Sequence, residues 1–458
     1  MENNSIINSN HKNFKTDWEP LPEIIALSAL SRSDLKKRLS TLHDLCINSS
    51  DIHSIKTIFA KSRHDFSSTN AYRLLLIVEN MENIVEILDT IIEDLEINTD
   101  GCWRSKNAFY GEIDCPGKLA FAFPGQGSQY TFMGRDLFHC FPEVRKSIAG
   151  ANAAFKASGK LTDFIYPDLT GRENEKVLIE EALRSTDVAQ PAIGAISISM
   201  LKVLDRFGIK PDTTCGHSYG ELTALFSANR FDEKTFFSLS VARGKYMAEA
   251  GGTGDKGGML AVKASLDRID DLIQSSGVDV ILANRNSPDQ GILSGATDAI
   301  LQMKSICRDN KIRAMVLPVA AAFHSKLIKD AAEPFKKKIA SVEFSHSRIP
   351  VYSNTTGAPY PDSAEDAKRI LGNHLMNPVN FIDEIQNMYQ TGIRIFVEVG
   401  PRTILTGLIK AILKDQDIYA LAVDASSGRH SGITDVAKTI CMLASIGYPV
   451  ALKKWKNS

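Results

Sequence analysis

The sequence predicts an α/β protein in which a parallel sheet carries a smaller ferredoxin-like unit. An apolar strand over 209–215 is followed at once by a glycine-rich turn and a helix-like run over 221–227, the order found in parallel α/β folds. A second apolar strand, 118–123, stops at a Pro-Gly turn. Between 258 and 318 the expected elements run strand–helix–strand–strand–helix–strand, which is the ferredoxin-like order.

Hydrophobic periodicity predicts each element of this ferredoxin-like unit. The expected strands are 259–263, 280–283, 291–294 and 312–319, and the expected helices are 266–274 and 298–307. The unit is assigned to 258–324 and interrupts a larger domain formed by 116–257 and 325–458. In the larger domain we also expect a helix over 189–204, strands over 349–353 and 393–399, and a helix over 403–413.

A smaller α/β domain is expected before the larger one, over 21–115. Its predicted strands are 24–29 and 72–78, and its predicted helices are 31–46, 51–62 and 81–95. Residues 1–20 are rich in Asn, Ser and Lys and have no apolar set to bury, so a disordered tail is expected there.

Composition limits the class of protein. The formal net charge of −1 gives no general attraction to nucleic acid or to an anionic membrane. Seven cysteines, an odd number with no C-x-x-C pair, argue against a disulfide framework or a zinc site. The first residues lack the apolar run of a signal peptide, and no stretch of 18 apolar residues suggests a membrane span. We therefore expect a soluble cytoplasmic protein.

The pentapeptide Gly216-His217-Ser218-Tyr219-Gly220 is the sharpest local signal. A serine on a strained turn between a strand and a helix exposes its hydroxyl, and the helix N-terminus favours developing negative charge. The hydroxyl still needs a base within hydrogen-bond reach. The pattern predicts a nucleophilic serine, and the alternative is a tight structural turn.

Three further features complete the candidate chemistry. The loop around Gln126, after the strand 118–123, has glycines whose open backbone N–H groups could stabilise an oxyanion, although alone it would be only a turn. His324 closes an apolar stretch and is a candidate base, whereas His217 points away from Ser218 and is interpreted as structural. Arg243 lies in the helix-like run 234–247, where a solvated charge would be the ordinary interpretation.

Together these features resemble the malonyl-CoA:acyl-carrier-protein transacylase family, which includes the acyltransferase domains of polyketide and fatty-acid synthases. The matching segments are FAFPGQGSQY (121–130), GHSYGELTAL (216–225), RGKYM (243–247), AAFHS (321–325), VYSNTTG (351–357) and FVEVGPRTILTGL (396–408). The resemblance covers about 118–445 and implies an α/β-hydrolase-like large domain with an inserted ferredoxin-like subdomain. Residues 20–115 resemble the linker domain between ketosynthase and acyltransferase, which implies an enzyme that serves a synthase in trans, or one excised from it.

The resemblance also implies roles for residues. Ser218 would attack a thioester, and His324 would accept its proton while the backbone carbonyl of Asn380 holds the imidazole ring. The backbone N–H groups of Gln126 and Tyr219 would form the oxyanion hole.

Specificity follows from the same resemblance. Arg243 would bind a malonyl carboxylate, and Phe323 would narrow the space beside C2, as in malonyl-selective enzymes. Ala321 and Tyr219 depart from the usual residues of the family, which leaves hydroxymalonyl or aminomalonyl open as the acyl group.

The sequence thus predicts transfer of a malonyl-type unit from CoA to the phosphopantetheine thiol of an acyl carrier protein, in polyketide or related fatty-acid biosynthesis. No cofactor, metal, nucleic acid or membrane is expected to take part. The alternatives are a proofreading hydrolase that releases stalled acyl groups from carrier proteins, and a scaffold that has lost its activity.

Overall fold

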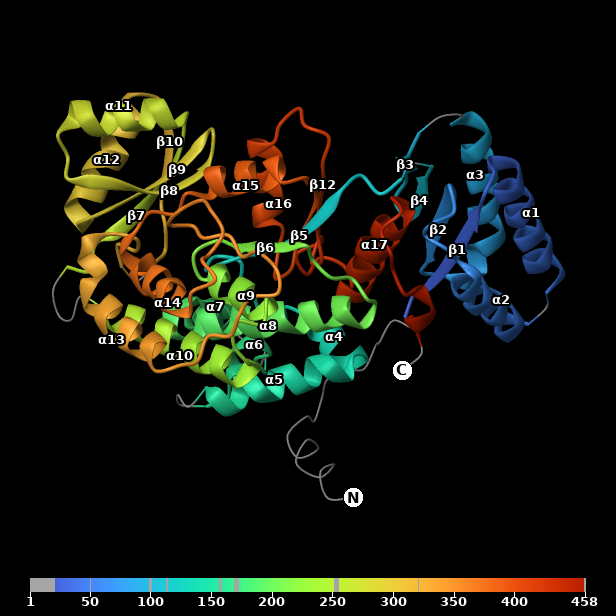
Figure 1. The fold of residues 1–458 in the computed structure, drawn as a ribbon, viewed down its shortest axis with the longest axis horizontal. Helices are drawn as coiled ribbons and strands as arrows, with labels where there is room; N and C mark the ends of the chain where they lie inside the picture. Colours follow the sequence, from blue (N-terminus) through green and yellow to red (C-terminus); the bar gives the residue numbers. More distant parts are fainter. Residues whose placement is uncertain are drawn as a thin grey trace, which may run out of the picture.

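Three four-stranded sheets organise the chain, which we describe from a computed structural model (Figure 1). The structure describes residues 21–49, 51–98, 101–112, 114–155, 159–168, 173–250, 255–319 and 321–456. The tail expected over 1–20 lies outside these residues. The N-terminal sheet and the ferredoxin-like insert lie at opposite ends of the molecule, with the parallel sheet between them (Figure 1).

The N-terminal domain is an antiparallel sheet in the order β1-β2-β4-β3 with helices on one face. Its elements are β1 (Glu23–Ala29), α1 (Arg32–Asn48), α2 (Ile52–Asp65), β2 (Tyr72–Val78), a 3-10 turn (Met81–Asn83), α3 (Ile84–Ile97), β3 (Trp103–Arg104) and β4 (Ala108–Gly111). The predicted strands and helices are confirmed, whereas β3 and β4 were not predicted.

Both faces of this sheet are buried, because successive side chains of a strand point to opposite faces. Leu74 and Leu76 of β2 pack with the helices of the domain, while Leu75 and Ile77 join the core of the large domain. Helix α17 (Gly432–Ser445) lies between the N-terminal sheet and the parallel sheet (Figure 1). The N-terminal domain is therefore joined to the large domain by a continuous core.

The large domain has a parallel sheet in the order β12-β11-β5-β6. The strands are β5 (Lys118–Phe123), β6 (Thr213–Gly216), β11 (Ile393–Glu398) and β12 (Tyr419–Ala422). The helices before the insert are α4 (Arg135–Cys140), α5 (Pro142–Ala154), α6 (Leu161–Ile165), α7 (Glu173–Arg184), α8 (Thr186–Arg206), α9 (Gly220–Ser227) and α10 (Glu233–Glu249). After the insert come α13 (Lys329–Ala340), α14 (Ala364–Asn373), α15 (Phe381–Gln390), α16 (Ile404–Ile412) and α17, with short 3-10 turns at Lys326–Ile328, His374–Met376 and Leu452–Lys454.

One strand prediction in the large domain was wrong. Residues 349–353 form only isolated bridges, from Val351 to Thr214 and from Tyr352 to Pro359. The chain turns back immediately afterwards, where the N–H of Gly357 donates to the carbonyl of Ser353. This turn leaves too little extended chain for a full strand beside β6.

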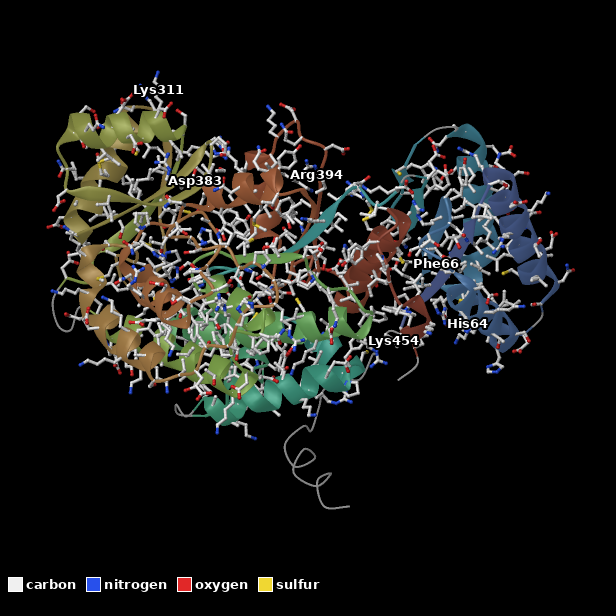
Figure 2. The ribbon with its side chains drawn as sticks, viewed as in Figure 1. His64, Phe66, Lys311, Asp383, Arg394 and Lys454 are labelled. Atoms are coloured by element: carbon white, nitrogen blue, oxygen red, sulfur yellow. The ribbon has the colours of Figure 1, made fainter. Side chains whose placement is uncertain are left out.

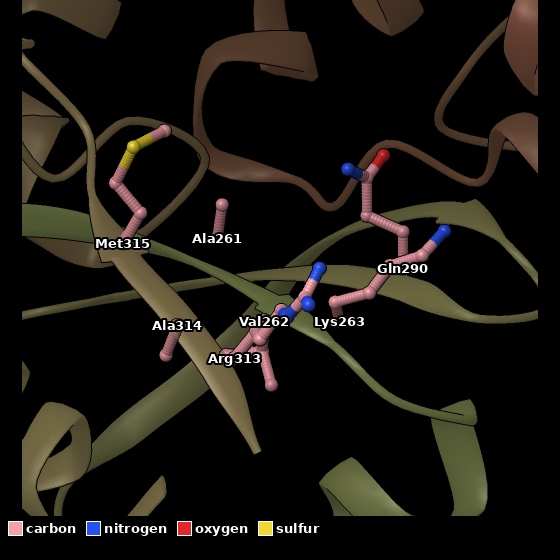
Figure 3. Close-up of a pocket in the computed structure, with 7 residues that line it drawn as sticks. All are labelled: Ala261, Val262, Lys263, Gln290, Arg313, Ala314 and Met315. Atoms are coloured by element: carbon pink, nitrogen blue, oxygen red, sulfur yellow. The ribbon is translucent and has the colours of Figure 1, made fainter. Parts of the chain in front are cut away.

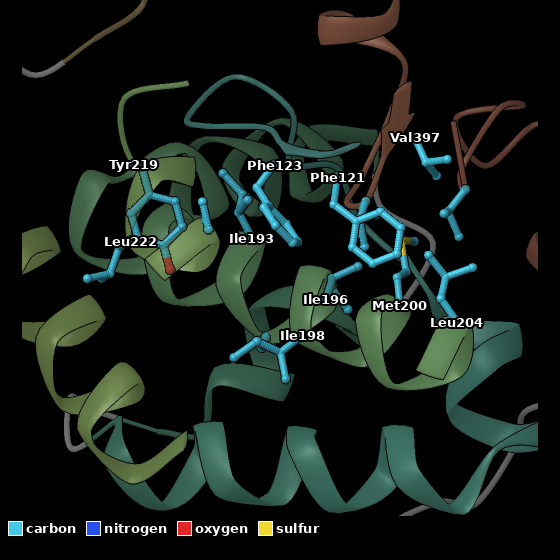
Figure 4. Close-up of a cluster of buried hydrophobic side chains, with 14 of the residues drawn as sticks. Phe121, Phe123, Ile193, Ile196, Ile198, Met200, Leu204, Tyr219, Leu222 and Val397 are labelled. Atoms are coloured by element: carbon cyan, nitrogen blue, oxygen red, sulfur yellow. The ribbon is translucent and has the colours of Figure 1, made fainter. Parts of the chain in front are cut away.

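Helix α8 forms the centre of the large core. Ile193, Ile196 and Met200 of α8 lie in one buried cluster with Phe121 and Phe123 of β5 (Figure 4). In the described part of the chain, α8 is the one helix long and apolar enough to cross a membrane, and 83% of its apolar window is buried inside the fold.

The insert confirms the predicted ferredoxin-like order. It consists of β7 (Gly258–Lys263), α11 (Leu266–Ser276), β8 (Val280–Ser287), β9 (Gln290–Gly295), α12 (Thr297–Asp309) and β10 (Arg313–Val316), with the antiparallel order β10-β7-β9-β8.

The two faces of the insert's sheet differ. Leu260 and Val262 pack in its core, whereas Met315, Arg313 and Lys263 line a shallow hollow (Figure 3). Exposed Lys311 lies nearby in the same insert (Figure 2).

Candidate active site

Ser218 lies on a sharp turn between β6 and α9, and its φ of 51° is in the left-handed region that residues other than glycine rarely adopt. The neighbouring glycines are required by crowding. A Cβ atom at Gly216 would lie 2.1 Å from the carbonyl carbon of Gly220, and one at Gly220 would lie 1.9 Å from the carbonyl oxygen of Phe123. The elbow predicted around Ser218 is therefore present, pressed against the end of β5.

The side chain of Asn354 holds this elbow in place. Its Oδ1 accepts the N–H of Ser218 at 2.6 Å, and its Nδ2 donates to the carbonyl of Gly216 at 2.6 Å and to Glu384 Oε2 at 2.7 Å. Sequence reasoning gave Asn354 no role, although it lies in the family-like segment 351–357. Fully buried Asn354 is thus a supporting residue that the sequence analysis missed.

His324 faces the nucleophile. Its Nε2 lies 2.8 Å from Ser218 Oγ, and its side chain is only 2% exposed. Its Nδ1 lies 3.0 Å from the carbonyl of Asn377 and 3.2 Å from that of His374. A proton on Nδ1 that is donated to these carbonyls leaves Nε2 free to accept the serine proton.

The prediction that the backbone carbonyl of Asn380 orients the His324 ring was wrong. Asn380 precedes α15, and its carbonyl accepts the N–H of Glu384 at 3.2 Å in the first turn of that helix. The carbonyls that meet His324 belong to the preceding turn, at His374 and Asn377.

His324 is neutral at pH 7 in this environment. Burial is the main cause, and the positive charge of Arg243 and the nearby His217 add to it, so the pKa of His324 falls to about 3. A neutral imidazole can act as a general base without first losing a proton.

Arg243 is a buried cation beside the nucleophile. It lies on α10, is 1% exposed, and its Nη2 is 3.4 Å from Ser218 Oγ. Its Nη1 has no hydrogen-bond partner within the described residues. Burial lowers the pKa of Arg243 to about 10, so the guanidinium remains charged at pH 7. A buried charge with an unused donor is costly, and an anionic ligand would compensate it.

The proposed oxyanion donors belong to two adjoining segments. Within the described chain, no intramolecular hydrogen bond uses the backbone N–H of Gln126 or that of Tyr219. The two segments touch, because a Cβ atom at Gly125 would lie 2.5 Å from the carbonyl oxygen of His217 and 3.5 Å from the nitrogen of Tyr219. The Gln126 side chain is anchored separately, with Nε2 3.2 Å from Thr186 Oγ1.

The other predicted residues surround this centre. Phe323 and Ala321 are buried on the segment that leads to His324. His217, interpreted as structural, has its Nε2 2.7 Å from Oδ1 of Asn286 in the insert. Tyr219 is also buried, and its hydroxyl lies 2.6 Å from Ser240 Oγ.

A buried polar network lies behind the site. Glu221 accepts the hydroxyl of Tyr360, and its Oε2 lies 3.3 Å from His374 Nε2. Burial raises the pKa of Glu221 to about 7 and lowers that of His374 well below its ordinary value. Across the described residues, no group of three or more His, Cys, Asp or Glu side chains is arranged to hold a metal ion.

Comparisons with known proteins agree with this geometry. Residues 120–432 match the family described as the acyl transferase domain. The chain is 34% identical over 307 residues to the polyketide biosynthesis malonyl CoA-acyl carrier protein transacylase PksC of Bacillus subtilis, which covers 65% of this chain and 98% of that protein.

Two further relatives extend the likeness. The chain is 31% identical over 331 residues to one of the chains of the polyunsaturated fatty acid synthase of a Thraustochytrium species, covering 70% of this chain and only 12% of that much longer protein. A crystal structure of the acyltransferase domain from module 8 of the salinomycin polyketide synthase matches with a TM-score of 0.78 at 20% identity, covering 95% of this chain and 98% of that one. At 20% identity this match supports the fold alone. The matched part of the chain includes the N-terminal domain.

Proposed function

Because the chain belongs to the acyl transferase domain family, we propose that it transfers a malonyl-type group from coenzyme A to the phosphopantetheine thiol of an acyl carrier protein. The observation that carries the proposal is the 2.8 Å contact between Ser218 Oγ and His324 Nε2 beside the buried, partly unpaired Arg243. The likeness to PksC supports the malonyl donor and the carrier acceptor.

The first half-reaction forms a serine ester. His324 Nε2 takes the proton of Ser218 Oγ as the oxygen attacks the thioester carbonyl carbon. The N–H groups of Gln126 and Tyr219 stabilise the resulting oxyanion. When the intermediate collapses, the C–S bond breaks, and the CoA sulfur leaves with the proton that His324 carried.

The second half-reaction reverses these roles. The carrier thiol gives its proton to His324, and its sulfur attacks the ester carbonyl. The bond from Ser218 Oγ to the acyl carbon then breaks, and the serine oxygen takes the proton back. CoA leaves before the carrier thiol attacks the serine ester, so the kinetics are ping-pong.

Arg243 gives the site its preference for a carboxylated donor. The free carboxylate of a malonyl group accepts hydrogen bonds from the guanidinium, including the Nη1 donor that lacks a partner among the described residues. An acetyl group leaves this buried charge uncompensated. Phe323, buried beside His324, limits the space around C2.

A transfer assay tests this function. The enzyme is incubated with malonyl-CoA labelled in the malonyl group and with phosphopantetheinylated carrier protein, and labelled carrier and free malonate are both measured. We expect labelled carrier to be the main product. Free malonate as the main product, with little labelled carrier, would contradict transfer and favour the hydrolase.

A further inference from the structure

We propose that the hydroxyl of Tyr219 is a positioning group for Arg243: its hydrogen bond to Ser240 holds helix α10 against the nucleophile elbow and thereby sets the preference for carboxylated donors. This inference rests on the proposed function. It assigns Ser240 a role in specificity, although Ser240 lies outside the family-like segments of the sequence. Under this proposal the Tyr219 hydroxyl bonds to Ser240 rather than to a polar substituent of a hydroxymalonyl or aminomalonyl group.

One buried hydrogen bond links the two parts of the site. Tyr219 follows the nucleophile directly, and its hydroxyl lies 2.6 Å from Ser240 Oγ on α10. Ser240 and Arg243 are three residues apart, so they lie on the same face of this helix. The bond therefore fixes the elbow relative to the turn of α10 that carries the guanidinium.

Helix α8 has space for the tyrosine hydroxyl only because residue 194 is glycine. A Cβ atom at Gly194 would lie 2.1 Å from the Tyr219 hydroxyl and 2.8 Å from Cζ of Phe236. Tyr219 and Ile193 of α8 belong to the same buried hydrophobic cluster (Figure 4). The hydroxyl is thus enclosed by α8 and α10 within the core.

A second close approach occurs next to Arg243. A Cβ atom at Gly244 would lie 2.9 Å from the carbonyl oxygen of Thr186, at the start of α8. Helices α8 and α10 therefore approach each other closely near Gly194 and again at Gly244, the residue after Arg243. If the bond between Tyr219 and Ser240 is lost, we expect α10 to shift relative to α8 and to displace the Arg243 guanidinium.

The ring of Tyr219 also contacts the charge that it positions. The guanidinium carbon of Arg243 lies 5.8 Å from the centre of the ring, within the range of a cation–π interaction. The same guanidinium is 3.4 Å from Ser218 Oγ. The guanidinium is therefore close both to the Tyr219 ring and to the Ser218 hydroxyl.

The test compares malonyl-CoA with acetyl-CoA in acylation of Ser218, using the full chain. The variants are Ser240→Ala, Tyr219→Phe and the double variant. The matched control is Ser199→Ala, because Ser199 is a buried serine of α8 whose hydroxyl, among the described residues, bonds only to the carbonyl of Ala195 in its own helix. For Ser240→Ala we expect KM for malonyl-CoA to rise roughly three- to tenfold, the effect of losing one buried hydrogen bond, with acetylation within about twofold of wild type.

The double variant should be no worse than either single variant, because both remove the same bond. Ser199→Ala should change the ratio of malonyl to acetyl loading by less than about twofold. An equal loss with both donors, or additive losses in the double variant, would overturn the proposal.

Acyl donors with a polar substituent at C2 provide a second, independent test of the role of the Tyr219 hydroxyl. If Tyr219→Phe changes the preference between malonyl-CoA and hydroxymalonyl-CoA while KM for malonyl-CoA is unchanged, the hydroxyl recognises the substituent and the proposal is overturned. Failure of the proposed function is distinguishable, because then the wild-type enzyme itself would either take no malonyl group on Ser218 or release it to water instead of to the carrier protein.

Discussion

Ser218 and His324 have the same unusual backbone conformation, with φ of 51° and 58°, but different interactions hold them. The nucleophile depends on a side chain, because Asn354 bonds to both the N–H of Ser218 and the carbonyl of Gly216. The base depends on the main chain, because its Nδ1 faces the carbonyls of His374 and Asn377. A substitution can remove the first kind of support, whereas it leaves a backbone carbonyl in place.

The strongest test of this comparison asks whether the two residues act as one unit. Ser218→Ala and His324→Ala should each lower transfer roughly 10⁴- to 10⁶-fold, because the serine is a weak nucleophile without its base. The double variant should be no slower than either single variant. Initial rates with malonyl-CoA and carrier protein measure this, and multiplicative losses would show that the two residues act independently.

Removal of the side-chain support on the nucleophile side should have the next largest effect. Asn354→Ala leaves the N–H of Ser218 and the carbonyl of Gly216 without this partner. It also removes the hydrogen bond that Asn354 Nδ2 donates to Glu384 Oε2. We expect transfer to fall about 10- to 100-fold and the free energy of unfolding to fall by about 2–4 kcal/mol. Single-turnover acylation and urea denaturation measure the two effects. If a folded Asn354→Ala variant acylated Ser218 at the wild-type rate, the supporting role of Asn354 would be contradicted.

A change of pH tests the base side. The lowered pKa of His324, about 3, means that its proton is lost well below neutral pH, so the active neutral form persists in acid. The rate of Ser218 acylation should therefore change less than about threefold between pH 7 and pH 5. A histidine with the ordinary pKa of about 6.5 would be only about 3% neutral at pH 5. If the acylation rate fell in proportion to that neutral fraction, burial would not be keeping His324 neutral.

The smallest effect is expected from a substitution on the base side. Asn377→Ala removes a side chain whose only hydrogen bond within the described parts of the chain goes to the carbonyl of Asn373, while the carbonyl that faces His324 remains. We expect acylation to fall less than about twofold. A loss as large as that of Asn354→Ala would erase the proposed difference between the two sides.

Much of the architecture could be predicted from the sequence because local patterns of apolar residues determine it. The alternating and helical periodicities predicted the insert in the correct order, and strands 72–78 and 118–123 were predicted with their observed ends. The short strands β3 and β4 were missed because two to four residues carry no usable period, and both strands are defined by their pairing, β4 with β2 and β3 with β4.

The site was predicted less completely, for a physical reason. Ser218, His324 and Arg243 have side chains whose chemistry marks them, and the structure brings them together. A backbone carbonyl carries no residue identity, so Asn377 and Asn380 could not be distinguished before α15 was placed. Asn354 acts on a residue 136 positions away, and the bond between Tyr219 and Ser240 depends on the space at Gly194.

The mass of the acyl adduct on Ser218 is the most direct test that this serine accepts a carboxylated acyl group. The enzyme is mixed with equal amounts of malonyl-CoA and acetyl-CoA without carrier protein, quenched rapidly, digested and analysed by mass spectrometry. We expect a malonyl ester on the peptide that contains Ser218, in clear excess over acetyl, and no adduct in Ser218→Ala. An adduct on another residue, or an acetyl ester in excess, would contradict this expectation.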